Sequence, residues 1–433
     1  MGTLQARLLE KLQPYIMPMA SLGVRGLGVL AGFAVTIYIG RLFGPVANGQ
    51  YAIVSQTAIF LAMIAIGGLD LAVAREFPQA KVQGKSVSRR SLALVLGQSL
   101  GIAIALAGIL TVASGPFLHM LGRPDLPQGS ILLLCLILLS RTLLRMLATI
   151  LRAQSYFLTS QAIEMLSVPL LTVVLIAAGL AGTVSEILLA TLIAGCIAAT
   201  GGMVVAWRES SGASDAWQVD MRKLYATAWP LWGVAIAQNF ADWYGLVTIT
   251  AIGGLAETGL FRVASQFAVS FSIITLGLLG TYSTPVSAAF HANDKELAAK
   301  TAGQATMLSL ALVLPLALIV LLLAPYLLGL VGPEFAASAT VLRVLLLGQI
   351  AFTFAGSASM VLAMSGHPRI NLWVNLMTTA AIVLTAPFFV RTWGATGLAA
   401  CISSLMAFRA ISCVLAVRRL EGIDVLRGRL IAE

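Results

Sequence analysis

Apolar stretches long enough to cross a lipid bilayer follow one another along the whole chain. Because an α-helix rises 1.5 Å per residue, about twenty apolar residues cross a hydrocarbon core of about 30 Å. Such stretches lie at about 17–40, 50–73, 91–114, 130–151, 160–181, 185–207, 226–252, 258–284, 301–324, 338–363, 370–390 and 395–417. The sequence therefore predicts an all-α integral membrane protein with about twelve transmembrane helices.

The composition leaves no room for a soluble domain of any size. Of 433 residues, 59% are hydrophobic and only 10% are charged, whereas about 25% of residues are charged in soluble globular domains. The longest hydrophilic breaks, Arg75–Arg90 and Arg208–Lys223, are too short to hold a catalytic domain. The net charge of +10 comes from residues scattered between the apolar stretches, so no nucleic-acid partner is expected.

Lysine and arginine are unevenly distributed between alternate loops. The loops on the side of the N-terminus hold eighteen of them, whereas the loops on the other side hold only Arg41, Arg123 and Arg391. Since these residues accumulate on the cytoplasmic side of membranes, we predict that both termini are cytoplasmic and that the number of spans is even. The remaining six basic residues lie within the spans and are Arg25, Arg141, Arg145, Arg262, Arg343 and Arg409.

The chain also repeats itself at half its length. The segment Gly44–Gln56 returns 210 residues later as Gly254–Gln266, with two glycines, an aromatic residue and a Ser-Gln pair in the same places. Repeats of six spans share one membrane orientation and are typical of transporters, whose binding site lies between the repeats. We therefore predict two pseudo-symmetric six-helix lobes at 1–207 and 224–433, joined by a cytoplasmic linker at 208–223.

The sequence carries no recognisable motif for a metal or cofactor. The four cysteines lie within apolar stretches without ligand spacing, the three histidines form no ligand set, and GxGxxG, Walker and HExxH patterns are absent. We therefore expect no metal, no cofactor and no enzymatic activity. ATP is not expected to drive the protein unless another subunit supplies it.

Several short motifs resemble those of one known family. The string Gly40–Pro45, followed by Gly49-Gln-Tyr51-Ala, is similar to the R-x-x-G-P-x-x-x-G-x-Y signature of bacterial polysaccharide transporters. These belong to the superfamily of MATE-like multidrug, oligosaccharidyl-lipid and polysaccharide exporters, which also holds the lipid II flippases. The second half of the chain carries further matching positions at Pro230, Asp242, Gly254, Gly259, Phe261, Pro285, Val331–Phe335 and Gly366–Arg369.

The resemblance covers essentially the whole chain and implies a function. It implies a flippase in the bacterial inner membrane for a polyprenyl-pyrophosphate-linked oligosaccharide, such as an O-antigen, capsule or exopolysaccharide repeat unit. Membrane lipid, and a polymerase and glycosyltransferases of the same pathway, would be its partners. Two departures from the pattern stand out. Lipid II flippases have two additional C-terminal spans, and Phe261 stands where the family more often has tyrosine. Gly44, Pro45 and Gly49 follow the pattern.

Arginines within the spans are the candidate substrate-binding residues. A pyrophosphate that leaves water needs cationic donors, and the fork of arginine suits two phosphate oxygens at once. We assign this role to Arg25, Arg141, Arg145 and Arg262. The competing interpretation of Arg141 and Arg145 is a structural ion bridge, for example to Glu164. The competing interpretation of Arg262 is that it extends toward the membrane surface, and we favour this interpretation for Arg343 and Arg409.

Three acids within or near the spans are candidates for coupling or gating. Asp242 lies past the middle of its span, where it either takes up a proton during transport or serves as the structural partner of Arg262. Glu164 and Asp70 lie about one turn inside the cytoplasmic ends of their spans, so we expect them to form capping or gating pairs.

Three other functions fit an apolar chain of this kind. A MATE-type antiporter for cationic drugs shares the expected fold, but its cavity should be acidic, whereas arginines outnumber acids within these spans. A membrane-embedded polysaccharide polymerase or glycosyltransferase would need a long outer loop, and no outer loop here exceeds about 15 residues. The repeat disfavours a passive channel.

Overall fold

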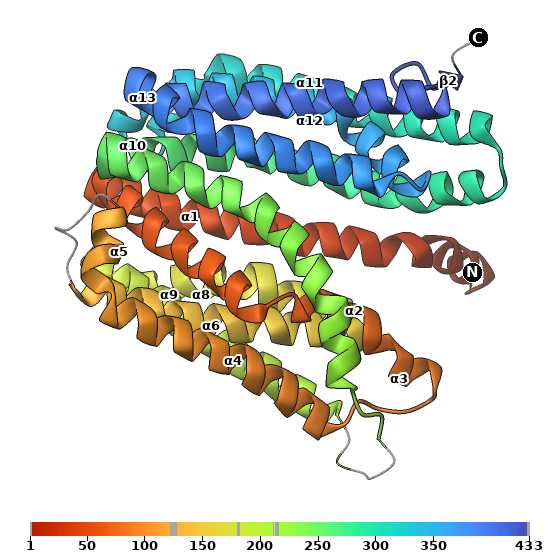
Figure 1. The fold of residues 1–433 in the computed structure, drawn as a ribbon, viewed down its shortest axis with the longest axis horizontal. Coiled ribbons are helices and arrows are strands. Elements are labelled where there is room, and N and C mark those ends of the chain that lie inside the picture. Colours follow the sequence, from red (N-terminus) through yellow and green to blue (C-terminus); the bar gives the residue numbers. More distant parts are fainter. Residues whose placement is uncertain (1, 122–127, 180–181, 211, 213–215, 431–433) are drawn as a thin grey trace. The chain divides into compact units, whose positions relative to one another are not determined.

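The structure is a computed structural model that describes residues 2–121, 128–179, 182–210, 212 and 216–430, without the side chains of 2–19, 22, 128, 230, 231, 234, 238 and 368. Its α-helices are α1 (Gly2–Ile66), α2 (Leu69–Glu76), α3 (Pro78–Val82), α4 (Arg89–Val112), α5 (Ser114–Met120), α6 (Gln128–Ala153), α7 (Phe157–Gln161), α8 (Val168–Ala177), α9 (Val184–Arg208), α10 (Met221–His291), α11 (Lys295–Gly329), α12 (Ala339–Met364) and α13 (Pro368–Glu421). A π-helix η1 (Ala162–Ser167), a 3-10 helix η2 (Pro333–Ser338) and the strands β1 (Ile423–Asp424) and β2 (Arg429–Leu430) complete the chain (Figure 1).

The described residues contain nine helices that are long and apolar enough to cross a membrane. Three of these, within α1, α10 and α13, are interrupted by a non-helical glycine at Gly44, Gly254 and Gly394. Each glycine has a positive φ, of 74°, 90° and 56° respectively, which a side chain would disfavour. Each interrupted helix thus supplies two crossings. The nine helices provide twelve crossings, which confirms the expected all-α membrane fold.

The chain divides into two compact units. Unit 1 comprises residues 1–36 and 54–236, and unit 2 comprises 37–53 and 237–433. Residues 37–53 therefore group with the second half of the sequence, and 224–236 with the first half. The six-helix lobes at 1–207 and 224–433 stay a prediction.

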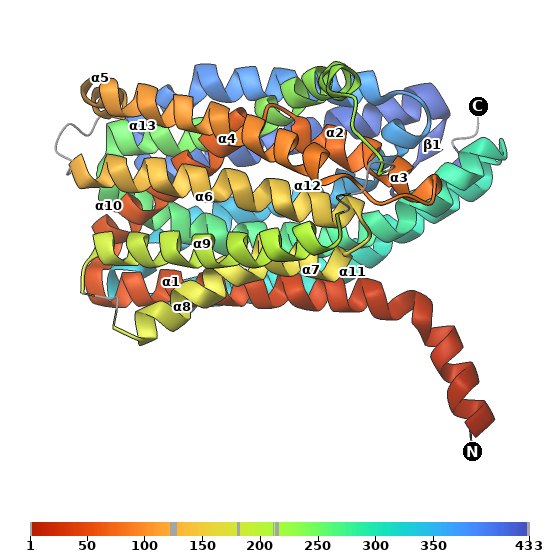
Figure 2. The ribbon, with the colours of Figure 1, turned by 90° about the horizontal axis from the view of Figure 1, so that it is seen from below.

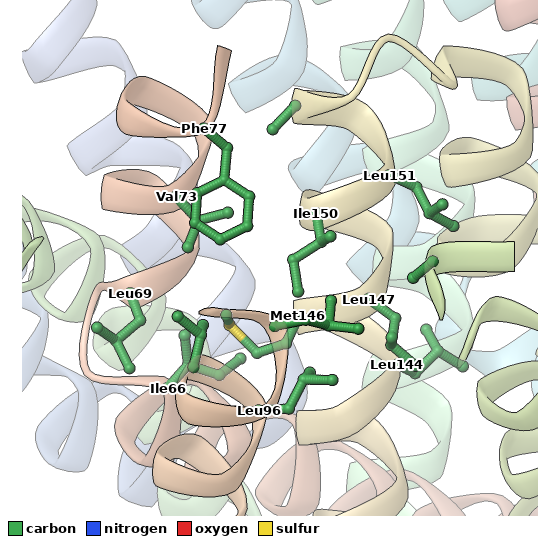
Figure 3. Close-up of a cluster of buried hydrophobic side chains, with 14 of the residues drawn as sticks. Ile66, Leu69, Val73, Phe77, Leu96, Leu144, Met146, Leu147, Ile150 and Leu151 are labelled. Atoms are coloured by element: carbon green, nitrogen blue, oxygen red, sulfur yellow. The ribbon is translucent and has the colours of Figure 1, made fainter. Parts of the chain in front are cut away.

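Unit 1 is built around α6. Helices α4 and α9 both pack against α6 and run beside it in Figures 1 and 2. Figure 3 shows Leu69, Val73 and Phe77 near α2 on the side that faces Met146 and Ile150 of α6. All five side chains are buried. Since lipid tails are as apolar as these side chains, close packing rather than escape from water holds such helices together.

Unit 2 is built around α12, which packs against α11 and α13. Small residues allow the close approach of α12 to α13, because a Cβ on Gly348 would lie only 2.8 Å from the Ser403 hydroxyl oxygen. Helix α11 has many exposed apolar side chains, including Leu316, Leu318 and Leu322. Such a surface suits contact with lipid and not with water.

Segments outside the crossings are anchored within each unit. In unit 1, Val87 forms an isolated parallel bridge with Trp217, so the two longest hydrophilic breaks lie against each other. In unit 2, β1 and β2 form a small antiparallel hairpin that the sequence did not predict. A Cβ on Gly303 of α11 would lie 2.4 Å from the Cα of Gly428, so the hairpin touches that helix.

Candidate functional site

An ion pair joins Asp70 to Arg145 inside unit 1. The second crossing breaks at Gly67 and Gly68, which both have positive φ, and α2 then begins with Asp70 in its first turn. The Asp70 carboxylate is buried, and its Oδ2 accepts a hydrogen bond from Nε of Arg145 and forms an ion pair with Nη2, both at 2.9 Å. The other oxygen accepts from the backbone N–H of Leu71 at 2.9 Å.

A second pair joins Arg152 of α6 to Glu164. Glu164 lies in the π-helix η1, an irregularity that occurs often at functional sites. The sequence had offered Glu164 as the partner for Arg141 and Arg145, but the structure pairs it with Arg152 and gives Asp70 to Arg145. Arg141, one turn before Arg145, is partly buried in α6.

Arg25 lies on the face of α1 that contacts α7 and η1. The Ser21 hydroxyl donates to Gln161 Oε1 at 2.7 Å, and a Cβ on Gly28 would lie 2.5 Å from the Met165 carbonyl oxygen. Ser21, Arg25 and Gly28 share one helical face, so Arg25 is level with the segment that contains Glu164. The Nε of Arg25 is buried and has no hydrogen-bond partner among the described residues.

Arg262 and Asp242 lie on α10 in unit 2. Arg262 is partly buried, with Tyr51 and Asp242 as its ionisable neighbours. Asp242 is exposed, and no ion pair within 4.0 Å joins it to Arg262 in the described part of the chain. The two residues are therefore neighbours without being a salt bridge.

The two repeated glycine motifs cross each other within unit 2. A Cβ on Gly49 would lie 1.9 Å from the Leu255 carbonyl oxygen, and one on Gly259 would lie 2.0 Å from the Pro45 carbonyl oxygen. The contact is reciprocal, as expected where two equivalent segments meet about a two-fold axis. Phe261, two residues after Gly259, is buried. The side chain of Pro230 is outside those that the structure describes.

Two carboxylates accompany the glycine breaks, and sequence reasoning missed both. Glu257 accepts the backbone N–H of Ala395 at 2.8 Å, directly after the break at Gly394. A Cβ on Gly44 would lie 3.3 Å from an oxygen of Glu334. A signal was available, because both acids lie inside the motifs that carried the resemblance.

The described residues contain no group of three or more His, Cys, Asp or Glu side chains that could hold a metal ion. Unit 1 instead holds arginines and acids on α1, α2, α6 and η1, and unit 2 holds Arg262 and Asp242 on α10. Such an arrangement can bind anionic groups, because a guanidinium donates to two oxygens of a phosphate or carboxylate.

A comparison with family models decides the family. The model described as "Polysaccharide biosynthesis protein" matches residues 19–291, which is more than half of the chain. The chain belongs to this family. A second model, MatE, matches residues 234–389 of this family member. No curated protein sequence matches it.

Solved structures with the same fold are transporters and a flippase. An inward-facing multidrug resistance MATE family transporter of the MOP superfamily is 17% identical, with a TM-score of 0.72, over 93% of this chain and 98% of that one. The lipid II flippase MurJ in an inward closed conformation is 12% identical, with a TM-score of 0.73, over 92% and 87%. A MOP superfamily transporter from Pyrococcus furiosus is 16% identical, with a TM-score of 0.60, over 93% and 94%. This polysaccharide biosynthesis family protein is thus a multi-pass membrane protein with the fold of MOP-superfamily transporters.

Proposed function

We propose that the protein flips a polyprenyl-pyrophosphate-linked oligosaccharide across the bacterial inner membrane by alternating access. The substrate is a repeat unit for O-antigen, capsule or exopolysaccharide, made and used by glycosyltransferases and a polymerase of the same pathway. Both termini lie in the cytoplasm. The two halves of the sequence form the lobes that expose the bound headgroup to one side and then to the other.

The observation that carries this proposal is the unpartnered Nε of Arg25. A guanidinium within a span is unfavourable by about 2.5–3.5 kcal/mol unless it is paired or hydrated. Arg25 has no ion pair or hydrogen bond to a described residue, unlike Arg145 and Arg152, whose charges Asp70 and Glu164 balance. Arg25 is thus available to an external anion, and membership of a polysaccharide biosynthesis family makes a lipid-linked pyrophosphate the fitting one.

The other candidate residues have distinct roles in this mechanism. Arg262 supplies a cation from the second half of the sequence, and Arg141 adds a third. The pairs Asp70–Arg145 and Arg152–Glu164 act as gates, because each joins two segments that must separate if the helices rearrange. The glycine motif keeps the first and second repeats in contact while the gates open and close.

Reconstituted flipping of a fluorescent polyprenyl-pyrophosphate oligosaccharide tests the proposal. Charge-assisted hydrogen bonds contribute about 1.5–3 kcal/mol, so Arg25→Ala should slow flipping by about tenfold or more. Arg25→Lys should restore part of the rate as a point charge without bidentate geometry. The exposed Arg90 has no ion pair in the described structure, so Arg90→Ala is the matched control. Normal flipping by an Arg25→Ala, Arg262→Ala double variant would end the proposal.

A MATE-type multidrug antiporter is the alternative function. The MatE model match at residues 234–389 favours it, and the exposed carboxylate of Asp242 offers a contact for a cationic drug. The two functions are separated by substrate charge. Vesicles that extrude an organic cation against a gradient, and that leave the oligosaccharide lipid unflipped, would select the antiporter.

A further inference from the structure

Unit 2 contains a cavity at a place where unit 1 contains an ion pair. The cavity has a volume of about 300 Å³ and lies between α10, α12 and α13. Its lining is mostly apolar and includes Leu276, Gly280, Gly356, Ser359, Met406 and Arg409. Leu276 is 54% exposed, so the cavity opens to the surface of the unit.

The repeat relates this cavity to the Asp70–Arg145 pair. The shift of 210 residues that carries Gly44 to Gly254 also carries Asp70 to Gly280. Helices α6 and α12 differ by 211 at both ends, since Gln128–Ala153 corresponds to Ala339–Met364, and this shift carries Arg145 to Gly356. Both members of the ion pair are therefore glycines in the second repeat, and both glycines line the cavity.

The second repeat has a glycine in place of Arg145, but a different helix places a cation at the cavity. Arg409 of α13 corresponds to the buried alanines Ala198 and Ala199 of α9, so the first repeat has no charge at this place. No carboxylate lines the cavity, and Arg409 makes no ion pair or hydrogen bond with a described residue. The sequence favoured extension of Arg409 toward the membrane surface, but the structure places it in the lining of this cavity.

The position of Arg409 argues against a purely structural charge. It lies nine residues before Arg418, or about 13 Å along the helix from the charged end of the crossing. A guanidinium stays protonated at any physiological pH, so at this depth it needs a counter-charge or water. In unit 1, Asp70 balances the charge of Arg145. In unit 2, Arg409 lies beside a cavity that no carboxylate lines.

We infer that this cavity binds the phosphate group of an amphiphilic lipid, with Arg409 as the donor to the phosphate oxygens. The apolar lining suits the chain next to the phosphate, and the volume lies at the lower end of the range for small-molecule sites. The lipid is either an anionic membrane phospholipid or a polyprenyl phosphate. The site does not depend on the proposed flipping, although a preference for the polyprenyl phosphate would connect the two.

The structure offers three variants of the full-length protein that separate charge from space. Arg409→Gln removes the cation. Gly280→Asp supplies in the second repeat the carboxylate that Asp70 supplies in the first, so it should neutralise Arg409 from within. Gly280→Leu fills the cavity, and it should fold because a Cβ on Gly280 meets no atom within 4 Å. Arg343→Gln and Gly101→Leu are controls, an arginine elsewhere in a span and an equally unobstructed glycine.

Binding is measured on purified protein in neutral detergent by native mass spectrometry and by thermal shift. The probes are a polyprenyl phosphate, phosphatidylglycerol, a neutral polyprenol of the same length and inorganic phosphate. We expect the unaltered protein and both controls to prefer the phosphate-bearing lipids to the polyprenol by about tenfold or more. Arg409→Gln and Gly280→Asp should lose this preference, and Gly280→Leu should lose both lipids.

The inference is overturned if folded Arg409→Gln and Gly280→Asp variants keep the preference, if polyprenol binds equally well, or if only inorganic phosphate binds. The flipping assay distinguishes this site from the proposed function. Lipid binding by a protein that flips nothing would remove the proposed function and leave the site. A Gly280→Asp variant that loses lipid binding but flips normally would show a lipid site that transport does not require.

Discussion

Gly49 and Gly259 occupy equivalent places in the two repeats and meet each other through their backbones. A Cβ on Gly49 would lie 3.1 Å from the Gly259 nitrogen, and a Cβ on Gly259 would lie 3.0 Å from the Gly49 nitrogen. Each would also collide with a carbonyl oxygen of the opposite segment at about 2 Å. The equivalent positions of these two glycines in the sequence repeat therefore correspond to a direct backbone contact between the two motifs.

Replacement of either glycine by alanine should disrupt the crossing. Because the obstructing atoms are backbone atoms, they cannot move aside as a flexible side chain can. We expect Gly49→Ala and Gly259→Ala each to destabilise the protein by about 1–3 kcal/mol, the usual range for overpacking. Thermal unfolding in detergent measures this. Gly97→Ala is the control because its Cβ meets no atom within 4 Å, and a Gly259→Ala variant as stable as this control would contradict the prediction.

The Asp70–Arg145 pair should show strong coupling between its members. Removal of Arg145 leaves a buried carboxylate without its counter-charge, a change that destabilises proteins by about 3–5 kcal/mol. Arg145→Ala should therefore lower the melting temperature far more than the double variant Asp70→Asn, Arg145→Gln, in which no charge remains. Equal losses in the single and double variants would show that the two side chains are not coupled.

The C-terminal hairpin should detach in acid. Burial raises the pKa of Asp424, but the N–H groups of Leu426 and Arg427 and the Arg418 guanidinium stabilise its charged form more strongly, so its pKa is lowered overall. A lowered folded-state pKa gives stability that is complete above the unfolded pKa of about 3.9 and is lost as the pH falls through the folded pKa. Hydrogen exchange at residues 423–430 should therefore rise below about pH 4. Asp424→Asn should exchange rapidly at neutral pH as well, and a flat profile in the unaltered protein would contradict this explanation.

The topology can be tested by reporter fusions. The lysine and arginine distribution predicts that the C-terminus is cytoplasmic and that the 122–128 loop is outside. Fusions after Glu433 and within 122–128 should report opposite sides of the membrane. A fusion within Arg208–Lys223 should agree with the C-terminal one. Reports from the same side for Glu433 and 122–128 would refute the predicted count of crossings between them.

The periodicity and composition of the sequence were sufficient to predict the fold, but not to predict which charged side chains pair with each other. The apolar runs predicted twelve crossings because hydrocarbon thickness fixes their length. The repeated motif put Gly44 and Gly254 at equivalent positions, but the helix breaks at these glycines came from the structure. The partner of Arg145 could not be read in this way. Asp70 is 75 residues away, and only the break at Gly67 and Gly68 brings it to α6. The cavity at Arg409 was hidden for a similar reason, since it exists through two glycines on different helices.

The role of Asp242 separates coupling from structure. The sequence allowed Asp242 to be either a titratable coupling group or the structural partner of Arg262. Asp242 is exposed and forms no ion pair within 4.0 Å in the described structure, so removal of its charge breaks no salt bridge with Arg262. We therefore expect Asp242→Asn to keep the wild-type protein level and melting temperature, because asparagine retains the size and the hydrogen-bonding ability of the side chain.

In vesicles the Asp242→Asn variant should lose the response of flipping to an imposed proton gradient, since it removes the group that would carry the proton. Glu296→Gln, a change at an exposed acid in the first turn of α11, is the control for loss of one negative charge. A less stable Asp242→Asn protein that still responds to the gradient would instead identify Asp242 as a structural residue.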